Sequence, residues 1–162
     1  MVYKSNYTTM QLTALVVLRV LTGWYFLYEG LVKLLSPSWS AYGYLMDSKG
    51  WLTSFFIGIA ESPVMLEVVN YLNIYGLVLI GLSLLLGVFA RAGSIGAIVM
   101  LALFYLSHPP LMDVSYVLRP EGSYLWVDKN LIILASVLVS GVVFPTSHRV
   151  GIDRILQRKK KR

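Results

Sequence analysis

The 162-residue sequence predicts an all-α integral membrane protein that folds as an antiparallel four-helix bundle. The composition is the first reason: 57% of the residues are hydrophobic and 14% are charged, and the mean hydropathy is +0.68. Soluble globular proteins do not combine so much apolar and so little charged sequence. The second reason is the presence of four apolar segments that approach the roughly 20 residues a helix needs to cross a bilayer. The third is the recurrence of small residues at helical spacing, which lets membrane helices approach closely.

We place the four spans of this single domain at residues 12–35, 71–89, 90–107 and 125–144. The last two are continuously apolar only over 93–107 and 130–144, so each must be extended at its start to reach spanning length. A soluble protein with buried core helices is the alternative, but the chain has no polar face large enough to solvate one.

The connections between the predicted spans differ in length. Ala90 and Arg91 join the second and third spans so tightly that these two helices must form an antiparallel hairpin. The loop over 36–70 is long and aromatic, so we expect it to form short interfacial helices on the extracytoplasmic surface. Ser62 followed by Pro63 is typical of the N-cap and first turn of a helix, here one that leads into the second span.

The formal net charge of +6 resides in the tail over 148–162, which holds seven Lys or Arg residues and one Asp. A basic cluster directly after a span is the usual sign of a cytoplasmic end that faces anionic lipid, and we expect no nucleic-acid partner. Four spans place both termini on one side, where nine basic residues face three on the other. We therefore predict a multi-pass protein of the plasma (inner) membrane of a prokaryote, with both termini cytoplasmic.

Cysteine and histidine limit the cofactors that this chain can hold. The sequence contains no cysteine, which excludes disulfide exchange, thiolate nucleophiles and iron–sulfur ligation. In the predicted topology His108 and His148 lie on opposite sides of the membrane, so they cannot share a metal ion or a haem. We expect neither a metal nor a haem centre from this chain alone.

The first predicted span carries three ionisable residues, Arg19, Glu29 and Lys33. Ionisable groups at membrane depth are costly and usually face the protein interior or a wet cavity. At about 100° per residue all three fall on one face of the helix, together with Thr22, Gly23, Phe26 and Gly30. This face is predicted to contact partner helices and polar groups, and the opposite face lipid.

Several elements deliver polar side chains to the outer end of the predicted bundle. They are Glu29, Lys33, Tyr105, His108, Asp113, Asp128 and Asn130. A carboxylate, a cation and an imidazole around an apolar slot are the groups that binding and protonating a quinone head group would require. We predict Glu29, Lys33 and His108 as catalytic residues. The predicted ligand-binding residues are Arg19, Tyr105, Asp113, Asp128 and Asn130.

Structural interpretations of the same residues stay open. Glu29 and Lys33 could form only an i, i+4 ion pair that makes a buried polar face tolerable. Arg19 lies deeper and could tie the first helix to a neighbouring carbonyl or to a lipid phosphate. His108, directly before Pro109, could be an interfacial helix cap.

The order and spacing of short motifs resemble those of the DoxX and DoxD family of small membrane proteins. The motifs are Arg19, Gly23, Glu29-Gly30, Lys33-Leu34, the Gly- and Leu-rich stretch over 81–87 with Arg91, Tyr105, Pro109 and the run Asp128-Lys129-Asn130-Leu131. The resemblance implies a four-helix membrane fold and an association with redox complexes. DoxD-like members are a subunit of thiosulfate:quinone oxidoreductase, which oxidises thiosulfate to tetrathionate and passes the electrons to membrane quinone.

On this basis we expect an integral membrane subunit of a quinone-linked oxidoreductase complex, with a quinone or a small apolar ligand near the outer ends of the helices. The chain has no evident redox centre of its own, so we expect a redox partner protein or a homo-oligomer, and whether the isolated chain is an enzyme stays open. Two alternatives are a non-catalytic scaffold that anchors an extracytoplasmic partner, and a small carrier for a lipid or an apolar metabolite.

Overall fold

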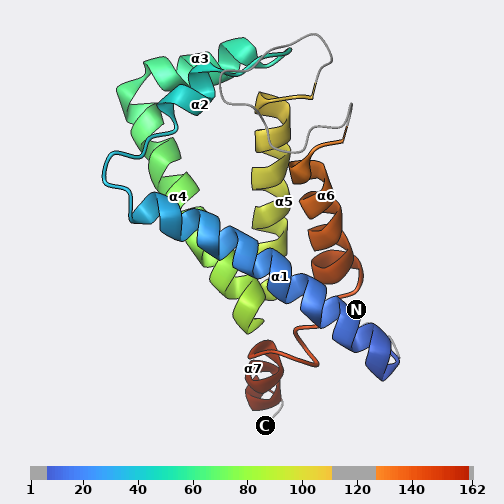
Figure 1. The fold of residues 1–162 in the computed structure, drawn as a ribbon. Helices are drawn as coiled ribbons and strands as arrows, with labels where there is room; N and C mark the ends of the chain where they lie inside the picture. The colour runs from blue at the N-terminus through green and yellow to red at the C-terminus, as the bar shows by residue number, and fades with distance from the viewer. Residues whose placement is uncertain (1–6, 111–126, 161–162) are drawn as a thin grey trace.

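The computed structural model describes residues 7–110 and 127–160, and in this part of the chain the regular structure is helical (Figure 1). The helices are α1 (Thr9–Leu34), α2 (Tyr42–Met46), α3 (Thr53–Glu61), α4 (Pro63–Leu86), α5 (Ala90–Ser107), α6 (Lys129–Val137), the π-helical η1 (Leu138–Val143) and α7 (Asp153–Lys160). Three of them, α1, α4 and α5, are long and apolar enough to cross a membrane. The all-helical class and the multi-pass membrane character are therefore confirmed.

The helices at the second and fourth predicted spans both begin at a side-chain cap. α4 begins at Pro63, as Ser62-Pro63 predicts, because the side chain of Ser62 accepts a hydrogen bond from the Met65 N–H and caps the helix there. The fourth apolar helix consists of α6 and η1, which have nine and six residues, fewer than the roughly 20 that span a bilayer. Asp128 fixes its start as the N-cap of α6. The described part of the chain therefore has three helices of spanning length and a shorter fourth, and the predicted four-helix bundle arrangement is not confirmed.

α1 crosses α4 obliquely and packs on it along much of its length, while α5 packs between α4 and α6 (Figure 1). The crossing depends on glycine. A Cβ on Gly81 would collide with the backbone of Leu27, and a Cβ on Gly23 would lie 2.9 Å from the backbone nitrogen of Leu85. The two backbones can approach this closely only without side chains at those points.

The tight hairpin predicted between the second and third spans is present, but its turn is formed by residues 87–89, and Ala90 and Arg91 are the first two residues of α5. α4 ends at Leu86, Gly87 adopts the left-handed conformation with φ +64°, and α5 begins at Ala90. The loop over 36–70, after the first predicted span, contains the short helices that the sequence predicts, which are α2 and α3. Both lie at one end of the molecule, and α7 lies at the opposite end (Figure 1).

Candidate functional site

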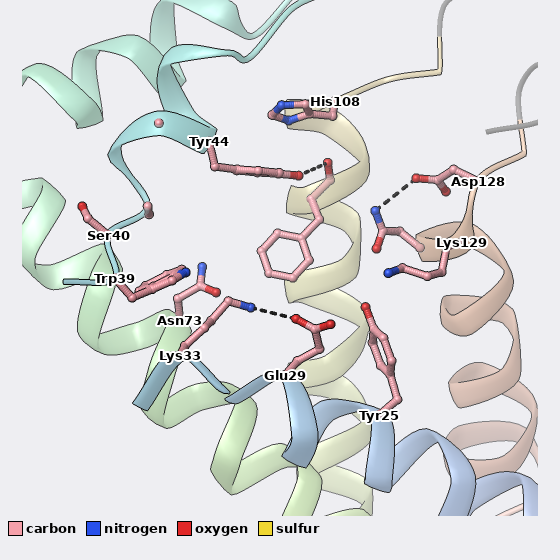
Figure 2. A pocket seen from close by; sticks show the side chains of 14 residues that line it. Tyr25, Glu29, Lys33, Trp39, Ser40, Tyr44, Asn73, His108, Asp128 and Lys129 are labelled. Atoms are coloured by element: carbon pink, nitrogen blue, oxygen red, sulfur yellow. Dashed lines mark hydrogen bonds and ion pairs between the residues drawn. The ribbon is translucent and has the colours of Figure 1, made fainter. Parts of the chain in front are cut away.

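A cavity of about 450 Å³ lies between α1, the segment that carries α2, and the facing ends of α5 and α6 (Figure 2). This volume falls within the range of small-molecule sites in proteins, roughly 300 to 1,000 Å³. The lining residues are Tyr25, Glu29, Lys33, Trp39, Ser40, Ala41, Gly43, Tyr44, Asn73, Phe104, His108, Asp128, Lys129 and Asn130. They come from five separate parts of the chain, so only the folded bundle creates the site.

The α1 side of the cavity carries an ion pair. Lys33 Nζ lies 3.2 Å from Glu29 Oε2, one helical turn away. The same Lys33 ammonium lies 5.5 Å from the centre of the Trp39 ring, at a distance typical of a cation–π contact. The Glu29 side chain keeps 37% of its surface exposed, against 16% for Lys33. The carboxylate is therefore the more accessible member of the pair for a molecule in the cavity.

The α6 side of the cavity is organised by the N-cap of that helix. Asp128 is 1% exposed, and its carboxylate accepts hydrogen bonds from the Leu131 N–H (2.8 Å) and from the Asn130 side-chain amide (3.1 Å). Lys129 lies across the cavity, with its Nζ 5.4 Å from the centre of the Tyr25 ring. Asp128 thus holds the start of α6 in place, and Lys129 and Asn130 present polar groups to the cavity.

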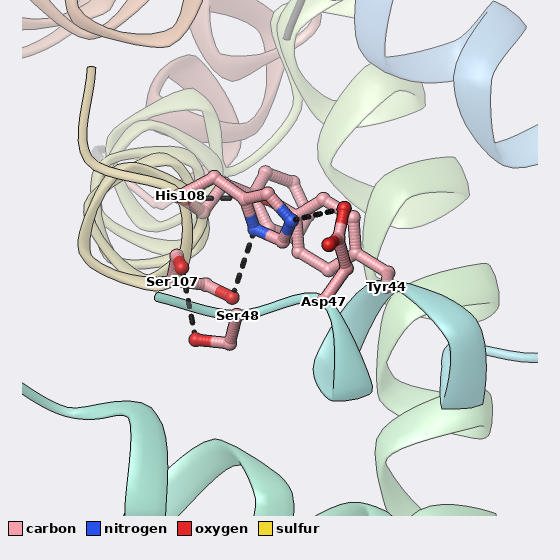
Figure 3. Close-up of polar contacts among 6 residues, drawn as sticks. Tyr44, Asp47, Ser48, Ser107 and His108 are labelled. Atoms are coloured by element: carbon pink, nitrogen blue, oxygen red, sulfur yellow. Dashed lines mark hydrogen bonds and ion pairs between the residues drawn. The ribbon is translucent and has the colours of Figure 1, made fainter. Parts of the chain in front are cut away.

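His108 forms part of the wall where α5 ends. The imidazole is 2% exposed and stacks on the Tyr44 ring, with 4.0 Å between the ring centres. Its Nδ1 lies 3.1 Å from Ser107 Oγ, and its Nε2 lies 3.9 Å from Asp47 Oδ2 (Figure 3). Burial lowers the pKa of His108, and the positive charge of Lys49 lowers it further, while the negative charge of Asp47 acts in the opposite direction. The neutral imidazole is therefore favoured near pH 7.

The segment that carries α2 is tied to the end of α5 over the cavity. The Tyr44 hydroxyl donates to the Phe104 carbonyl (3.2 Å), and the Ser48 hydroxyl and the Lys49 N–H both donate to the Ser107 carbonyl (2.9 and 3.2 Å). The last carbonyls of a helix lack a partner within the helix, and the contacts from Ser48 and Lys49 satisfy that of Ser107. The Phe104 carbonyl also accepts from the His108 N–H (3.1 Å), so the Tyr44 hydroxyl is its second donor. The roof of the cavity is thus held by hydrogen bonds to its wall (Figures 2 and 3).

The structure brings most of the predicted site residues together. Glu29, Lys33, His108, Asp128 and Asn130 line the cavity. Tyr105 is absent from the lining, because its neighbour Phe104 occupies that position on α5. Asp113 lies outside the described residues.

Arg19 belongs to the other end of the molecule. Its Nη1 donates to Thr146 Oγ1 and its Nη2 to the Val150 carbonyl, each at 2.9 Å, and the residue is 3% exposed. These contacts tie α1 to the segment before α7, as the structural interpretation of Arg19 proposed. Arg19 does not line the cavity, so a ligand bound there does not contact it.

Other lining residues were not among the predicted site residues. The aromatic ones are Tyr25, Trp39, Tyr44 and Phe104, and the polar ones include Asn73 and Lys129. Tyr25 lies one turn before Glu29, and Lys129 stands between Asp128 and Asn130, so spacing could have indicated these two. Trp39 lies in an irregular connection and Tyr44 in the five-residue helix α2, which is too short for periodicity to give a direction for a side chain.

A family model described as DoxX matches residues 14–109, from α1 through the end of α5. No curated protein and no solved structure matches the chain. The matched segment includes Glu29, Lys33 and His108 and most of the cavity. The match covers more than half of the 162 residues. This multi-pass membrane protein therefore belongs to the DoxX family.

Proposed function

We propose that this chain is the membrane subunit of a quinone-linked oxidoreductase complex and that a quinone head group binds in the cavity above Glu29 and Lys33. The observation that carries the proposal is the cavity itself. It has a volume of about 450 Å³ and is lined by a carboxylate, two ammonium groups and several aromatic rings, in a protein whose main helices are long enough to cross a membrane.

The donor set of the cavity fits a quinone head group, which is a flat ring with two hydrogen-bond-accepting oxygens. Lys33, Lys129 and Asn130 supply donors, and Tyr25 and Trp39 supply ring surfaces. Small-molecule sites typically combine apolar walls with a few such polar groups. A bound quinone would supply a carrier for two electrons and two protons.

The residues of the chain would perform three tasks at this site. Lys33 and Lys129 would donate hydrogen bonds and stabilise negative charge on the ligand oxygens. Glu29, the more exposed member of its ion pair, would accept or release a proton. His108 would hold the Tyr44 ring in the wall by stacking on it. Its Nδ1 faces Ser107 and its Nε2 faces Asp47, so neither nitrogen is directed at the ligand. A direct donor role for His108 requires one of those two contacts to be exchanged.

The sequence contains no cysteine to ligate an iron–sulfur cluster, so in this proposal the electrons come from outside the chain. We propose a redox partner protein as the electron donor, with a second copy of this chain as the alternative arrangement. The DoxD resemblance suggests thiosulfate oxidation as the reaction of such a partner. The donors and rings of the cavity support the proposal of a quinone ligand.

For the topology we propose that the helix Lys129–Val143 makes the fourth crossing, tilted or in a thinned bilayer, and that both termini are cytoplasmic in a prokaryotic inner membrane. The start of α1, the α4–α5 hairpin and α7 lie at one end of the molecule, in support of this orientation (Figure 1). The basic tail over 148–162 includes α7, and a basic segment after a span favours the cytoplasmic side. The cavity then opens in the outer half of the membrane.

Photoaffinity labelling with an azidoquinone tests the proposed site. The protein is illuminated in detergent with the probe, alone and with an excess of unlabelled quinone, and the labelled peptides are identified by mass spectrometry. We expect competable labelling of Tyr25, Trp39 or Tyr44, whose rings line the cavity. Labelling confined to exposed residues such as Leu72 and Leu79 on the surface of α4 would contradict the proposal.

A further inference from the structure

A second hollow is formed by the segment that leads into α7 and by the start of that helix. α7 lies at the end of the molecule opposite to α2 and α3 (Figure 1). The volume of the hollow is about 430 Å³, and it is lined by Arg149, Val150, Gly151, Arg154 and Ile155. Two arginines and two branched apolar residues thus share one small surface depression. The quinone proposal makes no use of it.

The segment that forms this hollow is hydrogen-bonded to the α4–α5 hairpin. The backbone N–H groups of Ile152 and Asp153 donate to the carbonyls of Leu86 and Gly87 (3.1 and 2.9 Å). In return, the Asp153 carboxylate accepts hydrogen bonds from the backbone N–H groups of Phe89 and Ala90 (2.8 and 3.3 Å). The start of α7 is therefore fixed at the level where α4 ends and α5 begins.

These hydrogen bonds of the Asp153 carboxylate affect the charge of the surface around the hollow. Asp153 is the only acidic residue in the segment 148–162, which also holds seven Lys or Arg residues. Both oxygens of its carboxylate are directed at the α5 N-terminus, where they satisfy backbone donors. The side of the segment that carries Arg149 and Arg154 is consequently cationic.

Apolar side chains are exposed next to these arginines. Ile155 is 58% exposed and Leu156 is 44% exposed, and Val150 and Ile152 are also exposed. At about 100° per residue Ile152, Ile155 and Leu156 share one side of the helix, away from Arg154. A short helix with an apolar side and a cationic side is typical of a segment that lies in the membrane interface.

We propose that the hollow between Arg149 and Arg154 binds the phosphate of an anionic phospholipid in the leaflet at this end of the protein, with α7 lying in the interface. The Arg149 guanidinium lies 5.2 Å from the centre of the Tyr7 ring, which orients it beside the start of α1. Arginine binds phosphate with two parallel hydrogen bonds, and Arg154 can supply a second guanidinium. Val150 and Ile155 in the same lining favour a lipid over a free anion, because they offer an apolar surface to the apolar part of a lipid molecule.

The test measures the binding of phosphatidylglycerol to the full chain in a neutral detergent, by native mass spectrometry and by the lipid-dependent shift of Tm. Phosphatidylcholine and inorganic phosphate at matched ionic strength are the comparison ligands. Arg154→Gln removes one positive charge from the hollow. Arg154→Lys keeps the charge but removes the guanidinium, which donates two parallel hydrogen bonds. Arg91→Gln is the matched control, since Arg91 is an exposed arginine at the same end but outside the hollow.

We expect saturable binding of phosphatidylglycerol, with about fivefold weaker binding in Arg154→Gln, in line with about 1 kcal/mol for each basic residue at an anionic membrane surface. Arg91→Gln should bind as the wild type does, and Arg154→Lys should lie between them. Should Arg154→Gln fail to fold, Ile155→Ser replaces it, with weaker lipid binding expected from the loss of apolar contact. Equal binding of phosphatidylcholine, equal loss in Arg91→Gln, or full competition by inorganic phosphate would overturn the proposal.

Discussion

His108 is the residue in the cavity wall whose charge state the fold controls most clearly. Its imidazole is 2% exposed and lies between the Tyr44 ring, Ser107 and the Asp47 carboxylate. Burial, the largest cause, lowers its pKa, and the opposing effect of Asp47 is smaller. The folded protein therefore holds this histidine neutral at pH values where the unfolded chain would already protonate it.

This difference predicts a loss of stability in mildly acidic solution. A histidine in the unfolded chain has a pKa of about 6.5. Between that pH and the lowered pKa of His108, the unfolded state binds more protons, so stability falls as the pH falls. Above about pH 6.5 the contribution is fully present. We expect the Tm of the wild type to decrease from pH 7.5 to pH 5, and His108→Gln to show a smaller decrease.

His148 supplies the control for this measurement. Burial and the charge of Arg149 lower its pKa as well, so its effect has the same sign. The variant His148→Gln separates the two contributions, and the double variant should have the flattest pH dependence. An undiminished decrease of Tm in His108→Gln would show that His108 does not carry the effect.

At the residue scale, the sequence could predict the side chains that sit on helices at regular spacing. Glu29 and Lys33 are one turn apart, and their ion pair forms as the spacing predicts. Asp47 could not be identified in this way, because it comes to His108 from the short connection after α2. Trp39 and Tyr44 reach the cavity from the segment between α1 and α3, whose path is set by hydrogen bonds to α4 and α5.

At the scale of the elements, the glycines of α4 differ in the space around them, since Gly81 faces α1 and Gly76 faces α5. A Cβ on Gly81 would collide with the Leu27 backbone, which cannot move aside. A Cβ on Gly76 of the same helix would lie 3.4 Å from Met100 Sδ, near the end of a flexible side chain. The same substitution should therefore have different effects at the two positions.

We predict that Gly81→Ala destabilises the protein by about 1 to 3 kcal/mol, the usual cost of overpacking a core. Gly76→Ala should be near neutral or slightly stabilising, because alanine favours a helix over glycine. Unfolding of both variants in a titration with denaturing detergent measures the difference. Equal stability of the two variants would mean that the close backbone contact at Gly81 does not support the fold.

The elements themselves were predictable where one local signal dominates. The long apolar runs predict α1, α4 and α5, and Ser62-Pro63 predicts the start of a helix at that point. The helix α4 extends beyond the apolar run that starts at residue 71, since the polar residues Glu67 and Asn70 interrupt the hydropathy without interrupting the helix. The oblique crossing of α1 over α4 depends on which glycines face each other, and hydropathy carries no such information.

At the scale of the whole molecule, the proposed orientation in the membrane can be tested with cysteine labelling. The chain contains no cysteine, so an introduced thiol is labelled without background. Ser54 is exposed on α3, and Ala92 is exposed at the start of α5, at the opposite end of the molecule. In intact spheroplasts an impermeant maleimide should label Ser54→Cys and leave Ala92→Cys unlabelled until the membrane is permeabilised.

The reverse labelling pattern would place α2 and α3 in the cytoplasm and would contradict the positive-inside argument. Labelling of both cysteines in intact spheroplasts would show that the helices between them do not separate two compartments. Either result would also move the cavity away from the outer half of the membrane.

The central claim, that the cavity binds a quinone head group, is tested most directly by equilibrium binding of a soluble short-chain quinone to the purified protein in detergent. The variants are Glu29→Gln and Lys33→Met, and Glu67→Gln is the control, since Glu67 is exposed on α4 and lies outside the lining. Thermal stability is recorded for each protein, so that a loss of fold is not read as a loss of site. We predict saturable binding to the wild type and the control, at least tenfold weaker in both cavity variants, on the order of 1.4 kcal/mol. The absence of binding to a stable wild type would contradict the claim and would favour a non-catalytic membrane scaffold.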